Sequence, residues 1–413
     1  MKPDATTASS TASLSPRLLL AAPHRLMFFI GAGNLLLAMT WWAAWLGSLR
    51  WPGIALPQPA AAPAGWLHAF VMQYQVLPSF FFGFLLTTFP KWTGQPEIPR
   101  RRYVPVALGL VGGQLATLLG ALGLPHGVLL GSALTLLGFV AGIAALAPLL
   151  WRETGTTWHA RSCLTALVLG LLGAMAWLAF LLGASPLWVF ASIKVGTFGL
   201  LLPVYVTVAH RMFPFFAGSA IKSYQPWRPL WLLALFWPLT MLHMGLELVH
   251  AYSWLWLADG PLLVLTATMC VRWWPRAPAP AILSVLFIGL AWLPVSFALY
   301  LGQNLAYLAT GVFWLGRAPA HALFIGFFGS VLIAMVTRVT QGHSGRPLRM
   351  PAVAWFAFIA IQLVAVTRVV AEVAAGAKTW QVIAAAGWLL AFTPWVMRIG
   401  RIYLTLRADG KDG

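Results

Sequence analysis

Long apolar runs recur along the whole chain and are separated by short polar segments. Each run has about the 20 residues that a helix needs to cross the hydrocarbon core of a bilayer. Prolines such as Pro125, Pro226 and Pro351 fall between the runs. The pattern predicts twelve membrane-spanning helices, and we expect the interrupted apolar stretch 302–318 to be re-entrant or interfacial. The expected spans are 26–46, 67–89, 104–122, 127–150, 162–183, 187–209, 230–250, 254–271, 281–301, 319–337, 352–372 and 380–400.

The composition excludes a soluble globular protein. Of the 413 residues, 60% are hydrophobic and 8% are charged, and the mean hydropathy is +0.82. Soluble domains are about 45–50% apolar and about 25% charged. The fold class is therefore all-α, a polytopic membrane helix bundle with one transmembrane domain over 23–406. We expect residues 1–22 to be a disordered cytoplasmic tail and 407–413 a second cytoplasmic tail.

The positive charge is explained by membrane topology. The chain has 26 Lys plus Arg against 8 Asp plus Glu, a net charge of +18. Of these 26 basic residues, 21 fall on one side of the alternating helices, which the positive-inside rule assigns to the cytoplasm. Both termini are then cytoplasmic, the bilayer is the expected partner, and a nucleic-acid partner is excluded. The five exceptions are Arg50, Lys194, Arg317, Arg368 and Lys378.

Acidic residues and cysteines are scarce. We expect Glu247 and Glu372 to be the acidic residues inside apolar segments. This scarcity disfavours a transporter built on rows of intramembrane carboxylates, and a hydrolase built on paired carboxylates. Cys163 and Cys270 lie in separate helices without a CxxC motif, so neither a disulfide framework nor an iron–sulfur site is expected.

The histidines fall into two layers when they are placed on the predicted helices. Imidazole is a common ligand of iron, copper and zinc, so each layer is a candidate metal site. His321 and His343 are 22 residues apart on one helix, about 33 Å, and cannot share a centre. We expect His126 to be an interfacial turn residue and His159 a solvated loop residue. The outer layer contains His68, His243, His250 and His321, and the inner layer contains His24, His210 and His343.

Two charged residues are expected to pair within the membrane. Glu247 follows His243 by one helical turn and shares its face, so its carboxylate can orient the imidazole. Lys194 lies about 12 Å inside its helix, where an unpaired charge costs roughly 2.5–3.5 kcal/mol, and Glu247 at a similar depth is its best partner. The pair has two interpretations, a structural ion pair or a role beside a bound group.

Three blocks of sequence resemble the NnrS family, bacterial membrane proteins that contain haem and copper and are linked to nitric oxide. The opening Pro23-His24-Arg25-Leu26-Met27-Phe28-Phe29 fits as well, and the blocks follow one another in order over most of the chain. The blocks are His68-Ala69 with Gly83-Phe84-Leu85-Leu86-Thr87-Thr88-Phe89-Pro90-Lys91-Trp92-Thr93-Gly94; Lys194-Val195-Gly196 through His210-Arg211-Met212-Phe213-Pro214-Phe215-Phe216; and His321-Ala322-Leu323 through Met335-Val336-Thr337-Arg338-Val339-Thr340 and Gly342-His343-Ser344-Gly345-Arg346.

The resemblance implies a protein of the bacterial cytoplasmic (inner) membrane that binds haem, b-type by expectation, and copper. It implies a role in the nitric oxide response, in protection against nitrosative stress during denitrification, with an electron donor that is not identified. The expected haem site has His24, His210 and His343, with Arg211 and Arg338 placed to pair with propionates. The expected metal site has His68, His243, His250 and His321, with Glu247 and Lys194 beside it.

One position departs from the family pattern. Many members carry His-Ala-His-Glu-Met at the start of the second helix, where this chain has His68-Ala69-Phe70-Val71-Met72. The resemblance therefore implies an outer site that is reduced, or completed by His243 or His250.

Three functional interpretations stay open. The first is a haem and copper protein of the nitric oxide response, with redox activity on nitric oxide undecided. The second is a multi-span transporter or channel without a redox cofactor, to which the repeated His-Ala at 68–69 and 321–322 adds a hint of internal repetition. The third is a scaffold whose histidines only form hydrogen bonds.

Overall fold

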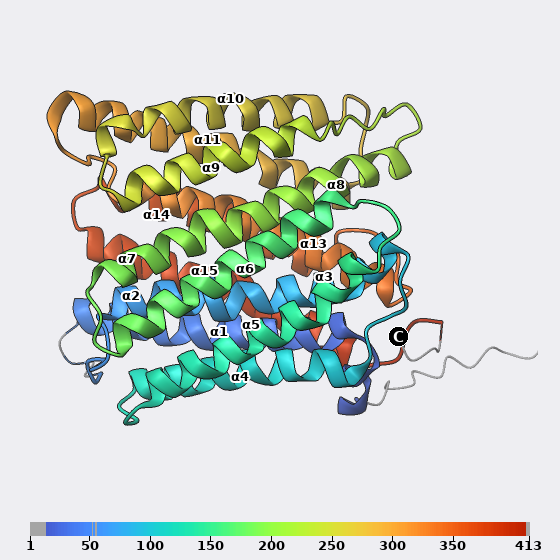
Figure 1. Cartoon of the computed structure of the whole chain (residues 1–413), viewed down its shortest axis with the longest axis horizontal. Coiled ribbons are helices and arrows are strands. Elements are labelled where there is room, and N and C mark those ends of the chain that lie inside the picture. Colours follow the sequence, from blue (N-terminus) through green and yellow to red (C-terminus); the bar gives the residue numbers. More distant parts are fainter. Residues whose placement is uncertain (1–13, 52, 54–55, 410–413) are drawn as a thin grey trace, which may run out of the picture.

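The fold is a bundle of long, roughly antiparallel helices (Figure 1). The computed structural model describes residues 14–51, 53 and 56–409, and these contain helices but no strands. Within these described residues, twelve helices are long and apolar enough to cross a membrane, which confirms the predicted number. Their bounds are Pro23–Arg50 (α1), Ala64–Thr93 (α2, η2 and α3), Arg100–Ala121 (α4), Gly127–Trp151 (α5), Trp158–Leu181 (α6), Leu187–Ala220 (α7, η3 and α8), Trp231–Leu248 (α9), Tyr252–Trp273 (η4 and α10), Ala281–Thr310 (α11), Ala318–His343 (α12, η5 and α13), Ala352–Val370 (α14) and Ala377–Tyr403 (α15).

The expectation of a re-entrant segment at 302–318 was wrong. Helix α11 continues to Thr310, so most of this stretch is simply its last turns. The polar residues that interrupt the apolar pattern, Gln303 and Asn304, are buried inside the bundle. The helix ends where Gly311 takes a left-handed backbone conformation (φ +70°), which glycine adopts without steric cost.

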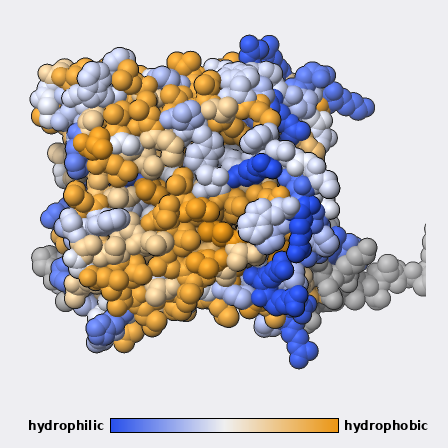
Figure 2. All heavy atoms as spheres, viewed as in Figure 1, coloured by the Kyte–Doolittle hydropathy of each residue, from blue (hydrophilic) through white to orange (hydrophobic). Residues whose placement is uncertain are grey.

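The two described ends of the chain lie at the same end of the bundle, which we call the inner end. The Ser15 N–H donates to the Leu404 carbonyl, and Arg25 donates to the Tyr403 carbonyl. Figure 2 shows hydrophilic residues gathered at this end and an apolar surface over the middle. The expected tail 1–22 includes a short 3-10 helix, Pro16–Ala21, whose Leu18 is buried. Residues 1–13 of that tail and 410–413 lie outside the described residues.

Glycines bring α4 and α5 into close contact. A Cβ atom added to Gly109 would lie 2.5 Å from the Cα atom of Gly138, and one added to Gly113 would collide with the Thr135 hydroxyl. Such contacts between backbones are possible only with small residues at the interface.

Three of the long helices contain a π-helical segment. The segments are Val71–Val76 (η2), Val195–Leu201 (η3) and Ala322–Gly329 (η5), about 125 residues apart in the sequence. They lie in the second, sixth and tenth membrane-spanning helices. The π-helical segment thus recurs every four spans, which divides the chain into three successive groups of four helices. Two of the segments also meet in space, because Gln73 of η2 donates to Thr197 of η3.

Candidate functional site

Each π-helical segment begins within three residues of a residue for which the sequence predicts a role. His68 precedes η2 by three residues, Lys194 directly precedes η3, and His321 directly precedes η5. A π-helical turn displaces the backbone ladder and changes the direction of the side chains around it, and such turns are frequent at functional sites. The sequence did not reveal these segments. Their common position marks the outer ends of these three helices as candidate sites.

His68 and His321 form an outer pair. The charge of His68 acts on His321, and Arg317 and Arg368 act on both, although neither a ring contact nor a hydrogen bond joins the two imidazoles in the described part of the chain. The His68 ring stacks on Trp42, with centroids 4.2 Å apart and planes 9° apart, and its Nδ1 atom is buried without a hydrogen-bond partner.

The orientation of His321 leaves one ring nitrogen for a ligand. Its Nδ1 lies 2.9 Å from the Arg317 carbonyl, to which it donates, so Nε2 carries the lone pair. A histidine that binds a metal usually donates its other N–H to a carbonyl or carboxylate in this way. Both histidines of the outer pair therefore have a ring nitrogen that could bind a metal. In His321 it is Nε2, and in His68 it is the buried Nδ1, which has no hydrogen-bond partner.

His24 and His343 form an inner pair at the opposite end of the bundle. Their ring centroids are 4.3 Å apart, and the planes are inclined by 41°. The Thr87 hydroxyl donates its proton to the Gly83 carbonyl at 2.8 Å. Its oxygen can therefore only accept from His24, whose Nδ1–H lies 3.5 Å away and is the donor. His24 Nε2 then carries the lone pair, as a metal ligand requires. Both histidines belong to the predicted inner layer, and the structure brings these two together.

His210, the third residue of that layer, forms hydrogen bonds with Pro229 and His159 instead of joining the inner pair. Its Nε2 lies 3.1 Å from the Pro229 carbonyl and donates to it, so its Nδ1 accepts the N–H of His159 Nε2 at 2.8 Å. The expectation that His159 is a solvated loop residue was wrong. Helix α6 begins at Trp158 rather than at 162, and His159 is buried on its first turn.

The two arginines expected beside the haem make other contacts. The Arg211 guanidinium lies over the Trp92 ring at 4.6 Å, and that of Arg338 lies over the Phe216 ring at 4.0 Å. The cations that act electrostatically on both His24 and His343 are instead Lys91 and Arg407. Both were present in the sequence, but no pattern there distinguishes them from the other basic residues at this end.

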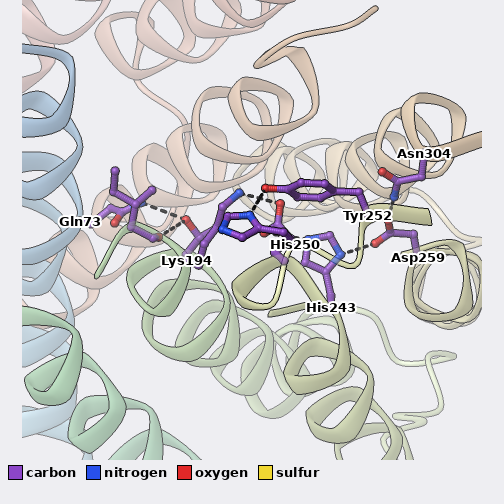
Figure 3. A network of polar contacts seen from close by, with 10 residues as sticks. Gln73, Lys194, His243, His250, Tyr252, Asp259 and Asn304 are labelled. Carbon is purple, nitrogen blue, oxygen red and sulfur yellow. Dashed lines mark hydrogen bonds and ion pairs between the residues drawn. The ribbon is translucent and has the colours of Figure 1, made fainter. Parts of the chain in front are cut away.

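His243 belongs to a buried polar network rather than to either pair (Figure 3). Its Nδ1 donates to Asp259 Oδ1 at 2.6 Å, and its Nε2 lies 3.3 Å from Glu247 Oε2. Glu247 accepts from Lys194 Nζ at 2.6 Å, which is the ion pair expected from their depths. Asn304 donates to the second oxygen of Asp259. The network crosses from the sixth membrane-spanning helix to the ninth.

Asp259 corrects the sequence analysis, which counted only Glu247 and Glu372 among the intramembrane acids. It lies in the first turn of α10 and is completely buried. Asp259 lies inside the predicted span 254–271, and a carboxylate buried at that depth needs a partner.

Three other residues occupy positions that the sequence assigns to the outer site: His250, Phe70 and Val71. His250 lies in the turn after α9, in a left-handed backbone conformation, and its Nδ1 is 2.6 Å from the Tyr252 hydroxyl. Phe70 and Val71 replace the family's His and Glu with buried apolar side chains, and Phe70 stacks on Trp177 at 4.7 Å.

The fold and these sites define a polytopic helical membrane protein with a pair of histidines near each end of the bundle. Comparison with protein families gives the more particular assignment. The family described as NnrS protein matches residues 18–407, nearly the whole chain, and the chain therefore belongs to the NnrS family. No curated protein matches it.

Proposed function

We propose that this protein binds haem through His24 and His343, binds copper through His68 and His321, and acts in the nitric oxide response of a bacterial cytoplasmic membrane. The observation that carries the proposal is the contact between the rings of His24 and His343, which come from segments more than three hundred residues apart. Membership of the NnrS family supports it. The inner end would face the cytoplasm, in agreement with the distribution of basic residues.

The number of ligands at the inner end suits haem. The described part of the chain contains no group of three or more His, Cys, Asp or Glu arranged to hold a metal ion. Haem iron brings four nitrogen ligands of its own and takes only one or two axial imidazoles from the protein. One imidazole of the pair is therefore sufficient to hold the group, since two rings whose centroids are 4.3 Å apart leave no room for a haem between them. Lys91 and Arg407 supply the positive charge that propionates require.

The outer end suits a copper ion with a smaller protein ligand set. Imidazole is a good copper ligand, and His68 and His321 offer two. Other coordination positions would remain for a small molecule. This differs from the four-histidine outer site expected from the sequence, because His243 and His250 have partners of their own.

When bound, haem iron supplies a binding position for nitric oxide and a one-electron redox couple. The residues of this chain would orient the group and exclude water from it. At the outer pair, where we propose copper, the Trp42 ring fixes the plane of His68 and the Arg317 carbonyl fixes the tautomer of His321.

The proposal is tested by the haem and copper content of the purified full-length protein, produced with both available. We expect a Soret band, strongly reduced in His24→Ala and in His343→Ala, and copper that is lost in His321→Ala. His126→Ala is the matched control, since this histidine is exposed at a turn. Absence of a Soret band from the unaltered protein, or unchanged haem in His24→Ala, would contradict the haem assignment.

One observation favours a second function, that of a transporter. Charged residues buried within membrane helices commonly mark ion or proton routes, and the network of Lys194, Glu247, His243 and Asp259 is of this kind. Uptake of a labelled ion or solute into proteoliposomes by protein that lacks haem and copper would favour the transporter.

A further inference from the structure

A small, partly open cavity lies among α1, α3, α8 and α13. Its volume is about 60 Å³. Protein interiors are close-packed and contain few voids larger than a water molecule, so a cavity of this size is a feature to be explained. Its wall comes from the first, second, sixth and tenth spans.

The cavity is apolar on all sides. Phenylalanine, valine, leucine, methionine and alanine side chains form its wall, and the one polar group there is the Tyr205 hydroxyl. That hydroxyl already donates to the Phe328 carbonyl at 3.2 Å. A buried water needs two to four polar partners, which this wall does not provide. The cavity is therefore suited to an apolar occupant.

The inner end of the cavity adjoins the inner histidine pair. Phe28 follows His24 by one helical turn on α1, and Val339 precedes His343 by one turn on α13, so each shares a helix face with its histidine. Val208 and Val339 are the two wall residues that are not buried. They mark the place where the cavity comes nearest to the surface, between α8 and α13.

We propose that this cavity takes up a small apolar gas molecule, of the size of nitric oxide, and holds it next to the site of His24 and His343. The assignment of the gas rests on the proposed function. The volume is about twice the share of about 30 Å³ that one water molecule has in the liquid, enough for a diatomic molecule. It is far too small for a haem or a lipid chain. An uncharged diatomic gas dissolves in the hydrocarbon of the bilayer, which gives it access to α8 and α13.

The first experiment uses xenon on the full-length protein, because xenon binds to dry apolar cavities whatever metals are present. A structure determined under xenon pressure should show xenon between Val204 and Val336. Val204→Phe, which fills the cavity, should abolish that xenon. Val366→Phe, the same substitution on the exposed face of α14, should leave it in place. Absence of xenon from the cavity of the unaltered protein would overturn the inference.

The second experiment measures the rate of nitric oxide association with the reduced haem protein. Val204→Phe should slow association by about tenfold, the effect of a barrier raised by about 1.4 kcal/mol, without changing the spectrum before nitric oxide is added. An unchanged rate in Val204→Phe would contradict a role in gas delivery. If the protein binds no haem, the proposed function fails, and the xenon experiment still decides whether the cavity takes an apolar gas.

Discussion

Replacing Lys194 by methionine removes the cation of a buried ion pair while keeping a side chain of similar length. Lys194 Nζ is 2.6 Å from Glu247 Oε1, and the other oxygen of Glu247 faces His243. The substitution therefore leaves a carboxylate inside the bundle beside a ring whose other nitrogen is occupied by Asp259.

The magnitude follows from the distance and the burial. Two unit charges 2.6 Å apart attract by about 6 kcal/mol at an effective dielectric constant of about 20. Desolvation of both groups offsets much of this attraction, and breaking a buried pair by removing one partner costs about 3–5 kcal/mol. Lys194→Met should therefore lower the free energy of unfolding by about 3–5 kcal/mol, and Glu247→Gln by a similar amount. The double variant should be more stable than the sum of the two losses predicts, by about 1–3 kcal/mol.

The assay is equilibrium unfolding of the purified protein in mixed micelles with increasing denaturing detergent. Lys378→Met is the matched control, because Lys378 is exposed and its replacement should change stability little. Losses that simply add in the double variant would show that the two side chains do not stabilise each other. The reasoning about the buried network would then be refuted.

Three further predictions follow from the contacts described above. His68→Ala should remove copper and leave the haem spectrum intact, as measured by metal analysis and absorption; loss of both would place haem at the outer pair. Gly109→Val should lower the free energy of unfolding by about 1–3 kcal/mol through overpacking against α5, whereas Gly112→Val, with only an ordinary contact there, should be tolerated; equal losses in the two would be inconsistent with this contact. Asp259→Leu should lower the free energy of unfolding by about 3 kcal/mol or more in the same micelle assay, because the substitution leaves the donors of His243 and Asn304 buried without an acceptor. A neutral effect would be evidence against the network.

Hydropathy was sufficient to predict the twelve spans, because a bilayer requires each crossing to be long, apolar and helical. Depth along the helices was sufficient to predict that Lys194 and Glu247 pair, since a charge in that position needs a partner. The same depth argument placed His24 and His343 in one layer. It could not show that His210 turns away from them, because the order of helices around the bundle is not a property of any single helix.

The π-helical segments could not be predicted for a different reason. An apolar run favours an α-helix and does not show where a rare π-helical turn interrupts it, so tertiary packing decides its position. Gln73, Tyr74 and Gln75 are consecutive, yet all three are buried and bonded to neighbouring helices. The error at His159 was local, a helix start misplaced by four residues.

The most direct test of the account is the absorption spectrum of the purified, reduced protein before and after addition of nitric oxide. We predict a Soret band that shifts when nitric oxide is added and that is strongly reduced in His343→Ala. A protein produced with haem available that shows no Soret band would contradict the central claim that imidazoles from distant segments together bind a redox group.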